Sequence, residues 1–445
     1  MSSHESPPAD RTPLFSAPPY APSSGRGQAG SRFGLVLSGG GVRGAYEVGV
    51  VEGIIDVLGI GARDPAPFGI FAGSSVGAIN AAFLAGHAGS GDMGVRRLRR
   101  IYERLELSHH VRPRWPGVGR GRLEGPSLLD PAPLEALVRE SLDWPALHAH
   151  VRAGRVRALT VAALDLADGR TTIFAEMASH ATFRGSEDPR RRVALEPITA
   201  EHVLASAAIP LVFPARRVGG RFFADGGVRF NTPLSPAIRA GATRLVVVTV
   251  GADASVHRKL THAPGLSVVA SRLLTALLSD PVRYELQVLG RLNRLLDVIE
   301  ENVTPEMLAT VQHTLIATRG APYRRVEVLE FSPSADLAGI AERHVRRLLS
   351  TGLLRYLPGA VRRAVDSADI LRDPDWATYL LFDGGFASEI HALGHADALA
   401  RADAIRAFFG EDELRERKEV VVVPDVPAPP LSASLGHARG RRPAR

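Results

Sequence analysis

The chain has 445 residues, a formal charge of +7 at pH 7 and no cysteine. Its length allows one large domain or two smaller ones with a sizeable buried core. The lack of cysteine excludes disulfides, thiolate metal sites and a cysteine nucleophile, and no apolar run reaches the roughly 18 residues of a spanning helix, so any membrane contact would be peripheral.

The two ends of the chain differ in composition from the middle. Residues 1–31 are rich in Pro, Ser, Ala and Gly and lack the basic start and apolar core of a secretory signal, so we expect a disordered leader. We expect residues 420–445 to form a short strand and a disordered basic tail. The positive charge comes almost entirely from arginines that are scattered without interleaved aromatic residues. This pattern favours a solvated surface over nucleic-acid binding. Because the lack of cysteine fits a cytosolic setting, we expect a cytoplasmic protein.

The first ordered elements alternate between strand and helix. Residues 33–37 form an apolar strand that breaks into a glycine-rich loop, and residues 45–58 carry apolar side chains at helical spacing before Gly59 ends the helix. A second apolar strand at 68–72 leads into a helix at 78–88. This order predicts an α/β fold with a mainly parallel sheet.

Later segments continue the sheet and then change in character. Helices are predicted at 95–107 and 131–142, and strands at 157–165, 171–174, 221–224 and 244–250, with 326–331 as a candidate edge strand. Beyond residue 254 the pattern is mainly helical, over 266–278, from a start at Ser279-Asp280-Pro281, and over 337–409. Pro281 suits the first turn of a helix. These leucine-rich helices favour packing against the core over a lid or a bilayer contact.

Ser75 is the candidate nucleophile. It is the centre of Gly73-Ser74-Ser75-Val76-Gly77, which joins an apolar strand to a helix. A sharp strand-to-helix turn lifts the middle side chain away from the backbone, and only small neighbours fit on either side. The helix start also favours the negative charge that develops during attack on a carbonyl.

The glycine loop after the first strand is the candidate oxyanion site. It exposes backbone N–H groups with little side-chain obstruction, over Gly39, Gly40, Gly41, Val42, Arg43 and Gly44. Arg43 either adds positive charge there or is a surface arginine. The same glycines match a dinucleotide-binding fingerprint, but that fold needs an acidic residue at the end of the second strand, which here holds Gly73 and Ser75.

Two kinds of base are compatible with this serine. A serine–histidine triad needs one of the histidines after Asp225, none of which lies in a recognisable context: His257, His262, His313, His344, His391, His395 and His437. Asp225 follows a strand and precedes Gly226 and Gly227, which suits an aspartate that deprotonates serine directly. Asp383 begins a second Asp-Gly-Gly triplet, but it lies between helical segments and suits a turn or an N-cap.

Taken in order, the glycine loop, the Ser75 motif and the Asp225 motif resemble those of the patatin-like phospholipases. Residues 205–214 and 231–233 also resemble that family, so the similarity covers about residues 33 to 250. The resemblance implies a three-layer α/β/α fold with a central, mainly parallel sheet. The C-terminal helical region expected from the sequence pattern lies outside the shared motifs and adds to that fold. It implies Ser75 as nucleophile, Asp225 as base, the glycine loop as oxyanion hole, and Gly73, Gly77, Gly226 and Gly227 as supporting positions.

The family's chemistry then predicts a function. It implies a serine lipid acyl hydrolase, similar to phospholipase A or lysophospholipase, that forms an acyl-enzyme without a metal or cofactor. The expected substrate is a phospholipid or another acyl-ester lipid, with peripheral membrane contact. Three alternatives remain: a transacylase, a catalytically silent lipid-binding or scaffold protein, and a carboxylesterase with a histidine triad.

The expected domain organisation follows from the same patterns. After the leader at 1–31 we expect a patatin-like catalytic domain at 32–252 and a mainly helical region at 253–419, followed by the tail at 420–445.

Overall fold

The computed structural model describes residues 32–110, 127, 129–183, 185, 188–210, 212–230, 233–251, 266–319, 325–350 and 378–410. The predicted leader at 1–31 and the predicted strand and tail at 420–445 lie outside these residues, as does most of 109–125. Within the described part, none of the helices has the combination of length and apolar character that crossing a membrane requires.

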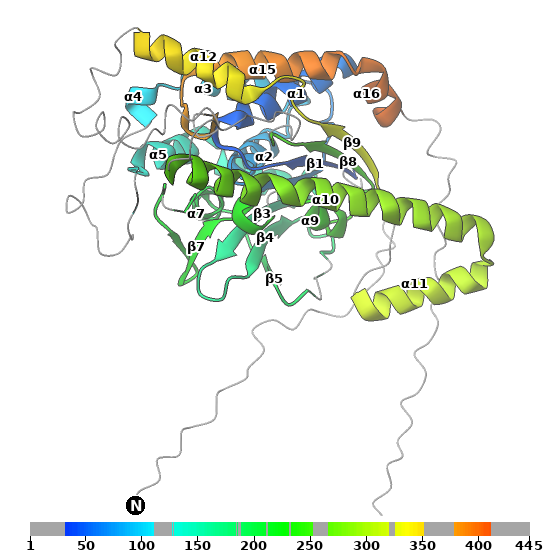
Figure 1. Ribbon diagram of the computed structural model, residues 1–445. Coiled ribbons are helices and arrows are strands. Elements are labelled where there is room, and N and C mark those ends of the chain that lie inside the picture. Colours follow the sequence, from blue (N-terminus) through cyan, green and yellow to red (C-terminus); the bar gives the residue numbers. More distant parts are fainter. Residues whose placement is uncertain are drawn as a thin grey trace, which may run out of the picture.

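A mainly parallel sheet forms the centre of the fold (Figure 1). In the described chain its order is β5-β4-β3-β2-β1-β8-β9, with β7 paired to β3 and β6 paired to β7. Neighbours from β3 through β2, β1 and β8 to β9 are parallel, whereas β4, β6 and β7 introduce antiparallel pairs. The strands are β1 (Phe33–Leu37), β2 (Ile70–Ser74), β3 (Ala158–Asp165), β4 (Thr171–Met177), β5 (Arg191–Leu195), β6 (Arg216–Val218), β7 (Arg221–Asp225), β8 (Arg244–Val248) and β9 (Glu327–Phe331).

Helices cover both faces of this sheet, which confirms the predicted three-layer α/β/α fold. Alternate residues of β1 point to opposite faces, as strand geometry requires. Leu35 and Leu37 belong to the core formed with α1 (Gly44–Leu58) and α2 (Val76–Gly86), whereas Val36 packs with α9 (Leu234–Arg239) and Leu286 of α10 (Leu266–Asn302). Figure 1 shows α1 and α15 (Gly384–Leu399) on one side of the sheet and α10 on the other.

The remaining helices lie around these layers. They are η1 (Gly41–Arg43), α3 (Val95–Glu103), α4 (Leu107–His110), α5 (Ala132–Ser141), α6 (Trp144–Arg152), α7 (Ala200–Ser206), α8 (Gly227–Phe230), α11 (Pro305–Arg319), α12 (Leu337–Ser350) and α16 (Ala402–Phe409). The sequence analysis did not anticipate α6, α7, β5 or β6.

The C-terminal helices are joined closely to the sheet and to α1. The candidate edge strand is confirmed, because β9 pairs in parallel with β8. Helix α15 lies against α1 so closely that a Cβ on Gly49 would be 2.0 Å from the His391 carbonyl oxygen, and one on Gly394 would be 2.3 Å from that of Tyr46. Small residues on both helices therefore permit this contact.

One prediction in this region was wrong. A helix over 266–278 and a second helix starting at Ser279-Asp280-Pro281 were expected, but α10 runs through Pro281 without a break. An interior proline removes a single backbone hydrogen bond of the helix. Packing of Leu286 and Leu289 against the sheet favours a continuous helix in spite of that loss.

Candidate active site

Ser75 occupies a strained turn between β2 and α2. Its backbone angles are φ 55° and ψ −129°, a left-handed φ that is rare for a residue with a side chain. Both flanking positions need glycine, because a side chain there would be too close to the neighbouring backbone. A Cβ on Gly73 would lie 2.2 Å from the Gly77 carbonyl oxygen, and a Cβ on Gly77 would lie 2.4 Å from that of Leu37. The predicted strand–turn–helix geometry of a nucleophile is therefore present.

Asp225 reaches Ser75 through the pairing of β3. Strand β2 pairs with β3 up to Ser74, opposite Ala162, and then turns away into α2. Strand β7 pairs with the next residues of β3, placing Asp225 opposite Ala163. Because β4 occupies the other edge of β3 at this point, β7 takes the place that β2 has left. The end of β7 thus lies beside the nucleophile turn.

The Ser75 hydroxyl donates a hydrogen bond of 2.6 Å to Asp225 Oδ2. The other carboxylate oxygen, Oδ1, accepts from the Gly227 N–H at 2.7 Å. Asp225 is fully buried, and this burial raises its pKa from 3.8 to about 7, against the opposing effect of the two hydrogen bonds. A carboxylate with a pKa near neutrality is a better proton acceptor than an exposed aspartate.

Ser206 fixes the backbone of the nucleophile. Its hydroxyl accepts the Ser75 N–H at 2.9 Å and donates to the Ala162 carbonyl oxygen at 2.6 Å. The Ser75 N–H therefore already donates a hydrogen bond to Ser206, so other N–H groups must bind an oxyanion. The sequence analysis did not single out Ser206 individually, although it lies in the 205–214 stretch.

The glycine loop is at the same edge of the sheet, because β1 and β2 are parallel neighbours with Leu37 opposite Gly73. Gly39 and Gly40 follow β1, Gly41, Val42 and Arg43 form η1, and Gly44 begins α1. Gly41 has φ +60°, and it lines the same pocket as Ser75. Backbone N–H groups at the start of a helix favour negative charge, so the loop is suitably placed for an oxyanion.

Arg43 is not the surface arginine that was one of the two expectations. Its side chain is buried, with 2% of the residue exposed. The guanidinium donates from Nε to Thr378 Oγ1 at 2.7 Å and from Nη1 to the Val250 carbonyl oxygen at 3.1 Å. It also lies 3.9 Å from the centre of the Tyr379 ring.

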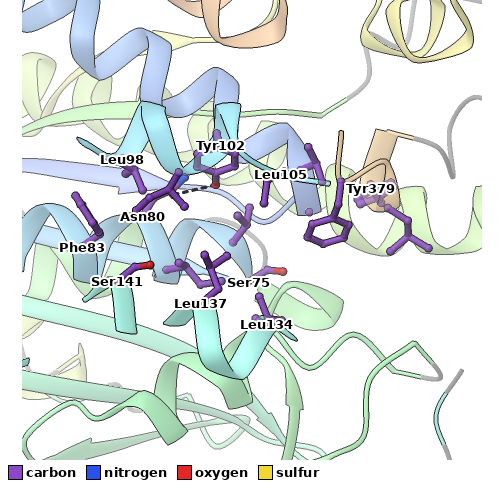
Figure 2. Close-up of a pocket in the computed structure, with 18 of the residues that line it drawn as sticks. Ser75, Asn80, Phe83, Leu98, Tyr102, Leu105, Leu134, Leu137, Ser141 and Tyr379 are labelled. Atoms are coloured by element: carbon purple, nitrogen blue, oxygen red, sulfur yellow. Dashed lines mark hydrogen bonds between the residues drawn. The ribbon is translucent and has the colours of Figure 1, made fainter. Parts of the chain in front are cut away.

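A largely apolar pocket adjoins the serine. Figure 2 shows Leu98 and Leu105 above it and Leu134 and Leu137 below it, with Ser75 between them. Its walls come from α2, α3, α5 and the segment before α15. Such a pocket suits a hydrocarbon chain bound close to the serine hydroxyl.

Comparison with known proteins identifies the family. Residues 35–238 match the family model described as patatin-like phospholipase. The chain carries a patatin-like phospholipase domain. A match to this family model implies lipid acyl hydrolase activity for the matched domain. The crystal structure of VipD from Legionella pneumophila is 13% identical to the chain, with 83% of this chain and 88% of that chain covered and a TM-score of 0.32. No curated protein matched the chain.

The other candidate residues have structural roles. Asp383 is the N-cap of α15 and accepts the Phe386 N–H at 2.9 Å, as its position suggested. Buried His344 and His391 pair with Glu389 and Glu52. Within the described residues, Ser75 and Asp225 form no hydrogen bond with a histidine, and no group of metal-ligating side chains occurs. His257, His262 and His437 lie outside those residues.

A buried polar cluster joins the glycine loop to the nucleophile helix. The Asn80 amide donates to the Gly44 carbonyl oxygen at 3.1 Å and to Glu47 Oε2 at 2.9 Å, and it accepts from the Tyr102 hydroxyl at 3.0 Å (Figure 2 shows the last bond). Burial raises the pKa of Glu47 well above its ordinary value, against the opposing effect of hydrogen bonds from Asn80 and Ser38. The cluster holds the starts of α1 and α2 together.

Proposed function

We propose that the protein is a serine lipid acyl hydrolase similar to phospholipase A or lysophospholipase, with Ser75 as nucleophile and Asp225 as its base. The observation that carries this proposal is the 2.6 Å bond from the Ser75 hydroxyl to a fully buried carboxylate whose pKa is about 7. Three further features support it: the strained nucleophile turn, the adjacent glycine loop and the apolar pocket.

Acylation begins when Ser75 Oγ attacks the ester carbonyl carbon and its proton passes to Asp225 Oδ2. The carbonyl π electrons move to oxygen, and the glycine-loop N–H groups stabilise that oxyanion. When the carbonyl re-forms, the bond to the leaving alkoxide breaks and the proton on Asp225 transfers to it. The alcohol departs and the acyl group remains on Ser75.

Deacylation repeats these steps with water. Asp225 accepts a proton from the attacking water, a second oxyanion forms, and its collapse returns the proton to Ser75 and releases the fatty acid. An alcohol in place of water would give transacylation by the same route. No step requires a metal or cofactor.

The pocket supports a lipid substrate. Apolar walls beside Ser75 favour an acyl chain, at about 0.8 kcal/mol for each buried methylene. We propose that the substrate is a phospholipid or another acyl-ester lipid. The protein would be cytoplasmic and would reach this lipid through peripheral contact with a membrane.

The test compares fatty-acid release from mixed phospholipid vesicles with hydrolysis of a short soluble ester. We expect wild type to act on both, Ser75→Ala and Asp225→Asn to lose about three orders of magnitude or more, and Asp383→Asn to stay close to wild type. Asp383→Asn is the matched control, because asparagine also caps helices. Circular dichroism verifies that each variant is folded. Activity that survives Ser75→Ala would overturn the proposal, and a folded wild type without activity would favour a silent lipid-binding protein.

A further inference from the structure

The pocket beside Ser75 includes side chains from far beyond the family match. That match ends at residue 238, yet Tyr379, Leu380 and Phe382 line the pocket together with Gly41 and Ser75. We call residues 378–382 the C-terminal strap. Leu380 packs with Ile209 and Phe213, so the strap is part of the wall opposite α2 and α3 rather than a surface segment.

Arg43 joins the glycine loop to this strap. Its Nε donates to Thr378 Oγ1 at 2.7 Å, Nη2 also contacts that hydroxyl, and its Cζ lies over the Tyr379 ring. Nη1 donates to the Val250 carbonyl oxygen, just beyond the end of β8. One buried guanidinium therefore contacts both the strap and the sheet edge. Its planar shape allows the stacking and the forked hydrogen bonds at once, which a lysine could not reproduce.

Backbone contacts hold both ends of the strap. The Tyr379 carbonyl oxygen is so near the glycine loop that a Cβ on Gly41 would lie 2.2 Å from it. After the strap, the Gly384 N–H donates to the carbonyl oxygen of Leu105, another pocket residue, at 2.8 Å. The strap is thus fixed against the glycine loop at one end and against the residues after α3 at the other.

We propose that the C-terminal strap selects the acyl chain of the substrate and that Arg43 is a positioning residue, which keeps the strap and the glycine loop in register. The proposal rests on the acyl hydrolase function and adds to it the part of the site that sets chain length. Arg43 then acts through Thr378 and Tyr379 and not as a positive charge offered to the oxyanion.

The first experiment varies the wall of the pocket. Leu380→Trp adds bulk beside the acyl chain, and Leu399→Trp, at an exposed leucine of α15, is the matched control. With nitrophenyl esters from butyrate to palmitate, Leu380→Trp should lower kcat/KM for the longest chains about tenfold or more relative to butyrate. Leu399→Trp should keep the wild-type profile. An unchanged chain-length profile in Leu380→Trp would overturn the selecting role.

The second experiment separates positioning from charge. Arg43→Lys keeps the charge but loses the fork and the stacking, and Thr378→Val removes the hydroxyl acceptor without touching Arg43. If Arg43 positions the strap, both variants should raise KM and flatten chain-length preference, and the double variant should be little worse than either single one. Near-wild-type kinetics in Arg43→Lys together with a large kcat loss in Arg43→Met would instead indicate an oxyanion charge and overturn the positioning role.

Binding to an inactive variant distinguishes failure of this inference from failure of the enzyme assignment. Laurate titrated into Ser75→Ala should bind, and adding Leu380→Trp should weaken that affinity about tenfold or more. If laurate binding is weakened in this way but wild type shows no turnover, the selecting role of the strap would be supported and the hydrolase assignment would be refuted. If wild type turns over substrate but Leu380→Trp leaves the laurate affinity unchanged, only the selecting role of the strap would be refuted.

Discussion

Replacing Asp225 by asparagine should stabilise the protein while it abolishes activity. Burial keeps the Asp225 carboxyl protonated in the native state up to about pH 7, whereas the unfolded chain loses that proton near its ordinary pKa of 3.8. Between these values the native state binds more protons than the unfolded state, so the contribution of Asp225 to the free energy of unfolding falls as pH rises. Asparagine has no such titration, and its amide can keep the Gly227 N–H bonded to Oδ1.

The size of the effect follows from the pKa difference. From 3.8 to about 7 is roughly three pKa units, which at about 1.36 kcal/mol each is about 4 kcal/mol of destabilisation in wild type at about pH 8. At about pH 5 the same relation gives a destabilisation of wild type of about 1.5 kcal/mol. The stability advantage of Asp225→Asn should therefore be larger at about pH 8 by about 2.5 kcal/mol.

Urea unfolding of the two proteins, followed by circular dichroism at both pH values, measures this quantity. Other titrating groups are common to both proteins and cancel in the difference. Asp225→Glu is the matched control, because it keeps a titrating carboxyl group at this site. A stability difference that does not change with pH would mean that Asp225 ionises at low pH, and the explanation of its basicity by burial would be refuted.

Three further outcomes follow from the same geometry. In wild type, log kcat/KM should rise with a slope near one below about pH 7 and then level off, because only ionised Asp225 accepts the proton; a pH-independent rate from about pH 5 to about pH 8 would contradict this. Ser206→Ala should lower kcat about tenfold in steady-state ester hydrolysis, because the Ser75 amide loses its acceptor, while a loss in stability alone would refute that positioning role. Gly41→Ala should abolish ester hydrolysis, because its Cβ would meet Tyr379. Gly59 has a similar left-handed φ with open space around it, so Gly59→Ala should lower the free energy of unfolding by only about 1 kcal/mol in thermal unfolding. Equal effects of the two substitutions would show that backbone strain, and not the contact with Tyr379, is responsible.

Local patterns predicted the elements that local chemistry determines. The Ser75 turn, the helix that Gly59 ends and the capping role of Asp383 all depend on residues within a few positions. The pairing of Ser75 with Asp225 spans 150 positions and depends on β7 replacing β2 beside β3. The family resemblance indicated that pair, but the hydrophobic pattern alone could not decide between aspartate and histidine.

The features that local patterns left open, missed or predicted wrongly involve contacts with distant parts of the chain. The position of Arg43 depends on Thr378, 335 positions away, so no window around the glycine loop could show that the side chain is buried. Pro281 favours a helix start locally, but the packing of α10 along the sheet overrides that preference. The contribution of Ser206 likewise depends on a hydroxyl reaching a backbone amide 131 positions away.

The C-terminal helices connect to the candidate active site through the helix that follows the glycine loop. Helix α1 begins at Gly44, at the end of that loop, and α15 begins at Gly384, at the end of the strap. The two helices contact closely at Gly49, Gly53 and Gly394, where a Cβ on any of the three would clash with the other helix. Because protein interiors transmit small displacements through such close packing, a shift of α15 would move both the strap and the loop. The boundary expected at residue 252 stays a prediction, but residues from both sides of it line the pocket of the candidate active site.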